Sequence, residues 1–142
     1  PVFTNGTMTD DRYITLFKKC RNLFPVISIE GKSEKTDDRR GKGIYEKVIS
    51  SMDLMQKNSV LFGASVTVTT ENMDEVYSRE FIDNIMKLGC KIVIYVEFVP
   101  VTEESKNLAP DDAARDIMKT KLDGLRKDIE EMVFISLTCR RP

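Results

Sequence analysis

The residue types that most often carry out catalysis are sparse in this sequence. The chain of 142 residues has no histidine, which excludes Ser–His and Cys–His nucleophiles and His-ligated metals. Its three cysteines, Cys20, Cys90 and Cys139, are too widely spaced for the compact ligand sets of zinc or iron–sulfur sites. We therefore expect no catalytic residue and no metal ligand in this chain, and interpret the cysteines as small buried thiols.

Polar side chains at the ends of apolar runs are better candidates for a binding site. They are Asn5, Ser28, Glu30, Thr67, Thr69, Tyr95 and Glu97. Their carboxylates and hydroxyls suit ribose hydroxyls, an amino group or another polar substrate, and no obvious nucleophile stands among them. The alternative is that Glu30 and Glu97 are simply solvated where their strands end.

A densely charged segment, residues 31–43, follows Glu30. Its glycines precede a helical pattern, and the N-terminus of such a helix can bind an anion, with Arg40 able to form a forked pair with a carboxylate or phosphate. The phosphate-binding loop motif is not met, because the Gly-Lys-Ser at residues 31–33 has no glycine at the required spacing before it. The charges by themselves are typical of a solvated loop.

The elements that would position these side chains alternate along the chain. Short β-branched runs predict strands at residues 2–4, 24–30, 61–69, 92–98 and 133–137, and helical periodicity predicts helices at 10–22, 43–57, 73–88 and 110–131. A helix in every connection implies parallel strands joined by right-handed crossovers. The length is that of a single α/β domain covering residues 1–142.

Two architectures fit this order: a doubly wound open sheet and part of a (β/α)₈ barrel. A doubly wound sheet has helices on both faces and needs strands that are apolar on both sides. Here Ser65 and Thr67 oppose Val66 within one strand. The alternation favours a partial (β/α) barrel, with one face on helices and the other turning polar toward the carboxyl end of each strand.

Several of these motifs resemble the radical S-adenosylmethionine (SAM) superfamily. The Thr-Asn-Gly at residues 4–6 resembles the end of the family's third strand. The most specific stretch, Val-Ile-Ser-Ile-Glu-Gly at 26–31 followed by Thr-Asp-Asp-Arg-Arg-Gly at 36–41, resembles the fourth strand and its loop in the sulfatase-maturase-like branch. Residues 66–69 with Asn72, and residues 98–101, resemble the fifth and sixth strands. The similarity runs through nearly the whole chain.

The resemblance implies an iron–sulfur enzyme that cleaves SAM to a 5′-deoxyadenosyl radical with a [4Fe–4S] cluster. It implies that Ser28 helps to hold the amino acid part of SAM, and that Arg40 lies near the SAM carboxylate. Glu30 stands where many members have aspartate. The residues that it places on the SAM side are Ser28, Glu30, Arg40, Ser65 and Thr67, and those toward an unknown substrate are Tyr95 and Glu97.

The chain departs from this family in one respect. The Cys-x-x-x-Cys-x-x-Cys loop that ligates the cluster is absent. We therefore expect a fragment of a radical SAM barrel that supplies part of the SAM pocket, is inactive alone, and self-associates through exposed sheet edges. The formal net charge of −1 does not point to nucleic acid. No apolar run suits a membrane span or a signal peptide, which predicts a cytoplasmic protein.

Two other hypotheses remain open from the sequence. A small flavodoxin-like or receiver-like binding module would have helices on both faces of its sheet. A receiver would also need an acidic pair after the first strand, where this chain has Asn5. A Schiff-base barrel enzyme such as an aldolase would need a lysine within a strand, and Lys91 stands at the wrong, amino-terminal end of its strand.

Overall fold

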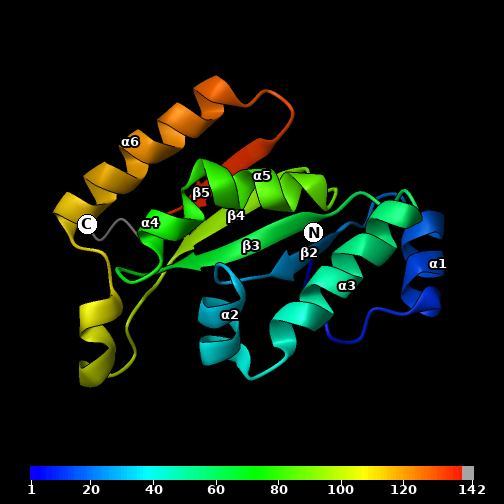
Figure 1. The fold of residues 1–142 in the computed structure, drawn as a ribbon, viewed down its shortest axis with the longest axis horizontal. Coiled ribbons are helices and arrows are strands. Elements are labelled where there is room, and N and C mark those ends of the chain that lie inside the picture. The colour runs from blue at the N-terminus through cyan, green and yellow to red at the C-terminus, as the bar shows by residue number, and fades with distance from the viewer. Residues whose placement is uncertain (139–142) are drawn as a thin grey trace.

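Five parallel strands form one sheet in the computed structural model, which describes residues 1–138. The strands are β1 (Val2–Thr4), β2 (Pro25–Ser28), β3 (Gly63–Val68), β4 (Ile92–Glu97) and β5 (Val133–Leu137). They lie side by side in chain order, each paired with the next (Figure 1). The five predicted strands are therefore confirmed, with ends that differ by no more than a few residues. Cys139, one of the three cysteines of the sequence, lies outside the described residues.

The four predicted helices are present, one of them in two pieces. They are α1 (Asp11–Lys19), α3 (Ile44–Lys57), the pair α4 (Met73–Val76) and α5 (Arg79–Lys87), and α6 (Asp112–Asp128). The break between α4 and α5 falls at Ser78, whose hydroxyl accepts a hydrogen bond from the Phe81 N–H. Serine favours this capping position because its oxygen satisfies an otherwise unbonded N–H of the new helix.

Two further elements were not predicted. The charged segment 31–43, interpreted as a loop, contains helix α2 (Ser33–Arg40), and a 3₁₀ helix, η1 (Glu103–Leu108), precedes α6. In α2 only Thr36 is buried, so the helix carries no apolar periodicity from which it could be read. None of the helices in residues 1–138 has the combination of length and apolarity needed to cross a membrane.

The hydrophobic core decides between the two predicted architectures. One cluster of buried residues joins α1, α3, α5 and α6 to a single face of the sheet, which includes Ile27, Ala64 and Val66. Strands in unbroken chain order with right-handed crossovers place every helix on the same side, whereas a doubly wound sheet reverses its order to use both. The partial barrel is confirmed, and the doubly wound sheet, with the flavodoxin-like hypothesis, is wrong.

We call the other side of the sheet the open face, and its two halves differ in polarity. On β2 and β3, Ser28 pairs in register with Ser65, and Thr67 follows on the same side. On β4 and β5 the matching positions are apolar, with Ile94 opposite Ile135 and Val96 opposite Leu137. Ile135 and Leu137 are 39% and 51% exposed. The expected polar face is therefore present only on β2 and β3.

Candidate functional site

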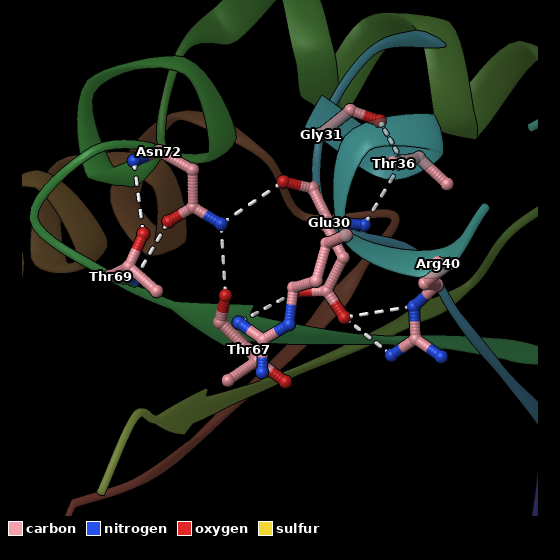
Figure 2. Close-up of polar contacts among 8 residues, drawn as sticks. Glu30, Gly31, Thr36, Arg40, Thr67, Thr69 and Asn72 are labelled. Atoms are coloured by element: carbon pink, nitrogen blue, oxygen red, sulfur yellow. Dashed lines mark hydrogen bonds and ion pairs between the residues drawn. The ribbon is translucent and has the colours of Figure 1, made fainter. Parts of the chain in front are cut away.

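Strands β2 and β3 part beyond their last ladder contact, the hydrogen bond from the Ile29 N–H to the Ser65 carbonyl at 2.9 Å. The side chain of Asn72 lies in the gap. Its Nδ2 donates to the carbonyl of Glu30 at 3.0 Å and to that of Thr67 at 2.9 Å. Figure 2 shows this amide joining the carboxyl ends of the two strands. The separation of β2 and β3 is thus set by one buried side chain.

Glu30 is the most deeply buried charged group of this region, at 1% exposure. Its Oε1 accepts hydrogen bonds from Arg40 Nε at 2.9 Å and from Arg40 Nη2 (Figure 2). Its Oε2 lies 3.7 Å from Arg39 Nη1 and has no hydrogen-bond partner within residues 1–138. The alternative of a solvated Glu30 is wrong, and because burying a carboxylate is costly unless its oxygens are satisfied, Oε2 is suited to a donor from outside the chain.

Helix α2 brings the two arginines to Glu30, and local contacts fix its orientation. The Glu30 N–H donates to Thr36 Oγ1 at 3.2 Å, and the Thr36 hydroxyl donates to the Gly31 carbonyl at 3.1 Å. At the other end of α2, the Asp37 carboxylate accepts the N–H groups of Tyr45 at 2.8 Å and Gly43 at 3.0 Å. These bonds hold the pKa of Asp37 below its ordinary value, because they favour the charged form.

A cavity of about 220 Å³ opens between β2, β3, α2 and η1. It is lined by Glu30, Lys35, Asp38, Arg39, Thr69, Glu71, Asn72 and Leu108. The guanidinium of Arg39, one of the lining residues, lies 5.3 Å from the ring centroid of Phe98, at the distance of a cation–π contact. The volume is below that of a pocket for a whole drug-sized ligand, so the cavity suits one polar part of a larger molecule.

The structure brings together the five residues predicted on the SAM side. Ser28 and Ser65 are register partners on the open face, and Glu30 follows Ser28 by two residues. Thr67 is linked to Glu30 through Asn72, and Arg40 is bound to Glu30. Arg40 is thus engaged by a carboxylate of the chain itself. The role of each residue toward SAM stays a prediction.

The placement predicted for Tyr95 and Glu97 is wrong. They pair in register with Val66 and Val68, which face the helices, so they lie on the opposite side of the sheet from Ser28. The Tyr95 hydroxyl donates to the Val76 carbonyl at 2.8 Å. Burial raises the pKa of Tyr95. The alternation of β4 gives two sets of residues without saying which faces the helices, and the apolar set is the one on the open face.

Glu97 is buried beneath α6, next to a cavity of about 1180 Å³ that its partner Arg115 helps to line. It is 6% exposed, and its Oε1 accepts from Arg115 Nε at 2.9 Å. Arg115 also binds Asp112 at 2.7 Å. These carboxylates raise the pKa of Arg115 above its already high ordinary value. The alternative of a solvated Glu97 is wrong as well.

The residues present do not fit a [4Fe–4S] cluster. Cys90 is buried before β4, and burial raises the pKa of its thiol to about 12, whereas a cluster ligand must be a thiolate. Cys20 lies at the end of α1. In the part of the chain that the structure describes, no three His, Cys, Asp or Glu side chains gather closely enough to hold a metal ion.

Two residues of the site were missed as candidates. Asn72 entered only through the resemblance, and Arg39 only as part of a motif, yet both line the cavity beside Glu30. A signal for Asn72 exists in the sequence, since an asparagine between a strand and a helix often bonds nearby backbone. Here its Oδ1 accepts the Thr69 N–H at 2.8 Å.

Comparisons with known proteins agree with this fold. No family model matches the chain. A serine-type anaerobic sulfatase-maturating enzyme of Bacteroides thetaiotaomicron is 29% identical over 104 residues, which are 70% of this chain and 24% of the relative. The chain therefore spans about a quarter of the length of that curated relative.

Two solved structures share the fold. Streptococcus suis SuiB bound to S-adenosylmethionine superposes with a TM-score of 0.78 at 14% identity, covering 97% of this chain and 32% of SuiB. The structure of anSMEcpe with bound AdoMet and the Cp18Cys peptide gives 0.71 at 17% identity, covering 94% and 39%. The predicted resemblance to the sulfatase-maturase-like branch of the radical SAM superfamily is confirmed.

Proposed function

We propose that residues 1–142 form a single domain that serves as part of a radical SAM barrel and holds one side of SAM at the carboxyl ends of β2 and β3. The observation that carries this proposal is Glu30, a buried carboxylate with one oxygen bound by Arg40 and the other without a hydrogen-bond partner among residues 1–138, although Arg39 lies 3.7 Å from it. It stands beside a hydroxyl-bearing sheet face. SuiB, a structural neighbour, was solved with SAM bound.

The contacts available to SAM follow from the donors and acceptors of the side chains around Glu30. Glu30 Oε2 can accept from an ammonium or ribose hydroxyl. Ser28 would contact the amino acid part, and Ser65 or Thr67 the ribose or adenine side. Arg40 uses Nε and Nη2 on Glu30, and since a guanidinium has five N–H groups, it retains donors for the SAM carboxylate.

Radical chemistry needs a cluster that these residues do not ligate. When bound, a [4Fe–4S] cluster supplies the electron that splits SAM. We propose that its ligands come from polypeptide other than these 142 residues, and that the chain alone does not cleave SAM. Detection of 5′-deoxyadenosine by mass spectrometry, after incubation of this chain with iron, sulfide, reductant and SAM, would contradict the proposal.

We also propose that the chain self-associates through its exposed sheet edges. Phe3 on β1 and Leu137 on β5 are 54% and 51% exposed, and both strands are at the edges of the described sheet. Apolar side chains beside an exposed strand edge favour pairing with another chain. Light scattering across a concentration series should show a mass that rises with concentration, and a constant monomer mass would overturn this.

We further propose a cytoplasmic protein without a nucleic-acid partner. Cys20 and Cys90 are free thiols in the described structure, as is usual in a reducing compartment. The formal net charge is −1, whereas nucleic-acid binding draws on a surplus of basic side chains. A shift of a labelled DNA or RNA oligonucleotide on a native gel at physiological salt would contradict the second statement.

The binding proposal is tested by titrating the ¹⁵N-labelled chain with SAM and following amide shifts. We expect shifts confined to residues 28–31 and 65–72, and weaker binding by Ser65→Ala. Ser50→Ala is the matched control, since this exposed serine bonds only the carbonyl of Glu46 within α3. The absence of amide shifts at millimolar SAM would overturn the proposal. Shifts that SAM causes only outside residues 28–31 and 65–72 would overturn it as well.

A further inference from the structure

The three residues 30–32, where the chain leaves β2, are held at both ends by one short segment that follows β3. Asn72 donates to the Glu30 carbonyl at 3.0 Å, and the Glu75 carboxylate accepts the Lys32 N–H. Gly31 lies between them at φ +137°. This backbone conformation favours glycine, and a Cβ at Gly31 would stand 2.7 Å from Glu75 Oε1, so a side chain here would displace the Glu75 carboxylate.

Every hydrogen-bonding group of the Asn72 side chain is used. The residue is 4% exposed, its Nδ2 bonds two carbonyls, and its Oδ1 accepts the Thr69 N–H at 2.8 Å. Aspartate, with the same shape, has no N–H to offer those carbonyls, and leucine has neither donor nor acceptor. The amide is therefore specific for the gap between Glu30 and Thr67.

Glu75 completes the start of α2. Lys32 is the N-cap residue of this helix, and its own side chain makes no capping hydrogen bond. The half-buried Glu75 places its carboxylate at that terminus from α4, where a negative charge favours both the backbone N–H and the helix dipole. The last residue of the same helix is Arg40, which binds Glu30.

We propose that Asn72 and Glu75 form a clamp that positions Glu30 and, through α2, Arg40 for a ligand at the carboxyl ends of β2 and β3. Both are positioning residues, since the hydrogen bonds of their side chains go to the backbone of residues 30–32. Asn72 sets where Glu30 leaves the sheet. Glu75 sets the direction of α2, and hence the position at which the Arg40 guanidinium meets Glu30. The identity of the ligand as SAM rests on the proposed function.

The test compares Asn72→Asp and Glu75→Ala with the conservative Glu75→Gln, which keeps an acceptor at Lys32. Asn58→Asp is the matched control, because its amide also donates to a carbonyl, that of Leu54 at 2.9 Å, but at the far end of α3. Each variant of the 142-residue chain is examined by amide hydrogen exchange, by thermal unfolding, and by NMR titration with SAM as the probe.

We expect Asn72→Asp and Glu75→Ala to speed exchange selectively in residues 31–40 and to weaken SAM binding about tenfold, the effect of one or two lost hydrogen bonds. Glu75→Gln should restore most of both. Asn58→Asp should lower thermal stability while leaving SAM binding and exchange in 31–40 unchanged. If Asn72→Asp does not fold, the comparison of Glu75→Ala with Glu75→Gln tests the clamp.

If amide exchange rates in residues 31–40 stay at their wild-type values in both Asn72→Asp and Glu75→Ala, the clamp is overturned. Faster exchange there with no loss of SAM affinity would overturn its role in positioning the site. If the wild-type chain binds no SAM while the variants still loosen residues 31–40, the clamp stands as a device of the fold and the proposed function fails.

Discussion

Two buried glutamates, Glu30 after β2 and Glu97 at the end of β4, look alike until the face of the sheet is considered. Each gives one carboxylate oxygen to an arginine, and the second oxygen of each has no hydrogen-bond partner within the described part of the chain. Glu97 lies on the helix face under α6, where Arg115 rather than Glu97 lines a cavity, whereas Glu30 itself lines a cavity beside the open face. Burial of a carboxylate therefore does not by itself mark a ligand site.

The arginines show why the two glutamates differ. Arg115 comes from α6 and is held at the same time by Asp112, so the Glu97 pair ties a helix to the sheet. Arg40 ends α2, directly beyond β2, and Arg39 stands beside it near the second oxygen of Glu30. The Glu30 site thus places two arginines at one carboxylate, and its cavity carries side chains of both charges, among them Lys35, Asp38 and Arg39.

Replacing the arginine of each pair should give the largest difference between the Arg115–Glu97 and Arg40–Glu30 pairs, measured as loss of unfolding free energy. Arg115→Met leaves the Glu97 carboxylate buried without its partner, which costs several kcal/mol of unfolding free energy. Arg40→Met should cost less, because Arg39 remains near Glu30. Urea denaturation measures both, and the double variant Arg115→Met with Glu97→Leu should recover most of the loss. An equal or larger loss for Arg40→Met would contradict the comparison.

Neutralising each glutamate should separate them by function. Glu30→Gln keeps the size of the side chain but removes its charge, and loss of a charged hydrogen bond should weaken SAM binding about tenfold or more. Glu97→Gln should leave SAM binding as in the wild type. The measurement is the NMR titration described above. Equal weakening by both variants would show that the face of the sheet does not decide the role.

Tyr95→Phe probes the helix side without altering a charge. The hydroxyl that it removes donates to the Val76 carbonyl in the interior, so we expect a loss of about 1 kcal/mol in unfolding free energy and no change in SAM binding. Guanidinium denaturation and the same titration give the two values. Weaker SAM binding at unchanged stability would instead return Tyr95 to the ligand side.

The smallest effect concerns Asp37, which joins the end of α2, where Arg40 lies, to the start of α3. The N–H groups of Tyr45 and Gly43 keep the pKa of Asp37 below its ordinary value of 3.8. Its charged form therefore adds stability above that pH, and the gain is lost as pH falls through the lower folded pKa. Thermal unfolding should show a higher Tm for the wild type than for Asp37→Asn at neutral pH, and this difference in Tm should disappear in acid. A difference in Tm that stays constant down to the lowest pH would contradict this.

The sequence is most informative where apolar periodicity is strong, and this accounts for the successful predictions of strands and main helices. Helix α2 has only Thr36 buried, so its existence depends on contacts with Glu30 and Glu75 that no local pattern contains. The same limit applies to β4. Its alternation is plain, but whether Tyr95 or Ile94 faces the helices depends on its register with β3.

The candidate site was predicted in part for a related reason. Glu30 and Arg40 stand in a recognisable motif, and the structure joins them. Asn72 acts in the gap between two strands whose divergence is a tertiary feature, and its partner Glu30 lies 42 residues away in the chain. A side chain whose bonds all go to backbone carries no pattern of charge or hydrophobicity that spacing alone can reveal.

The unbroken order of the strands has a consequence for how the polypeptide is made. Each strand pairs with the one synthesised just before it, so every βα unit finds its docking edge already built when it leaves the ribosome. Pairing across a crossover helix is slower than pairing within a hairpin, but domains commonly fold from the amino terminus during synthesis. The sheet can therefore grow by one unit at a time, and the Glu30 site is complete once Leu108 of η1, which also lines its cavity, has emerged.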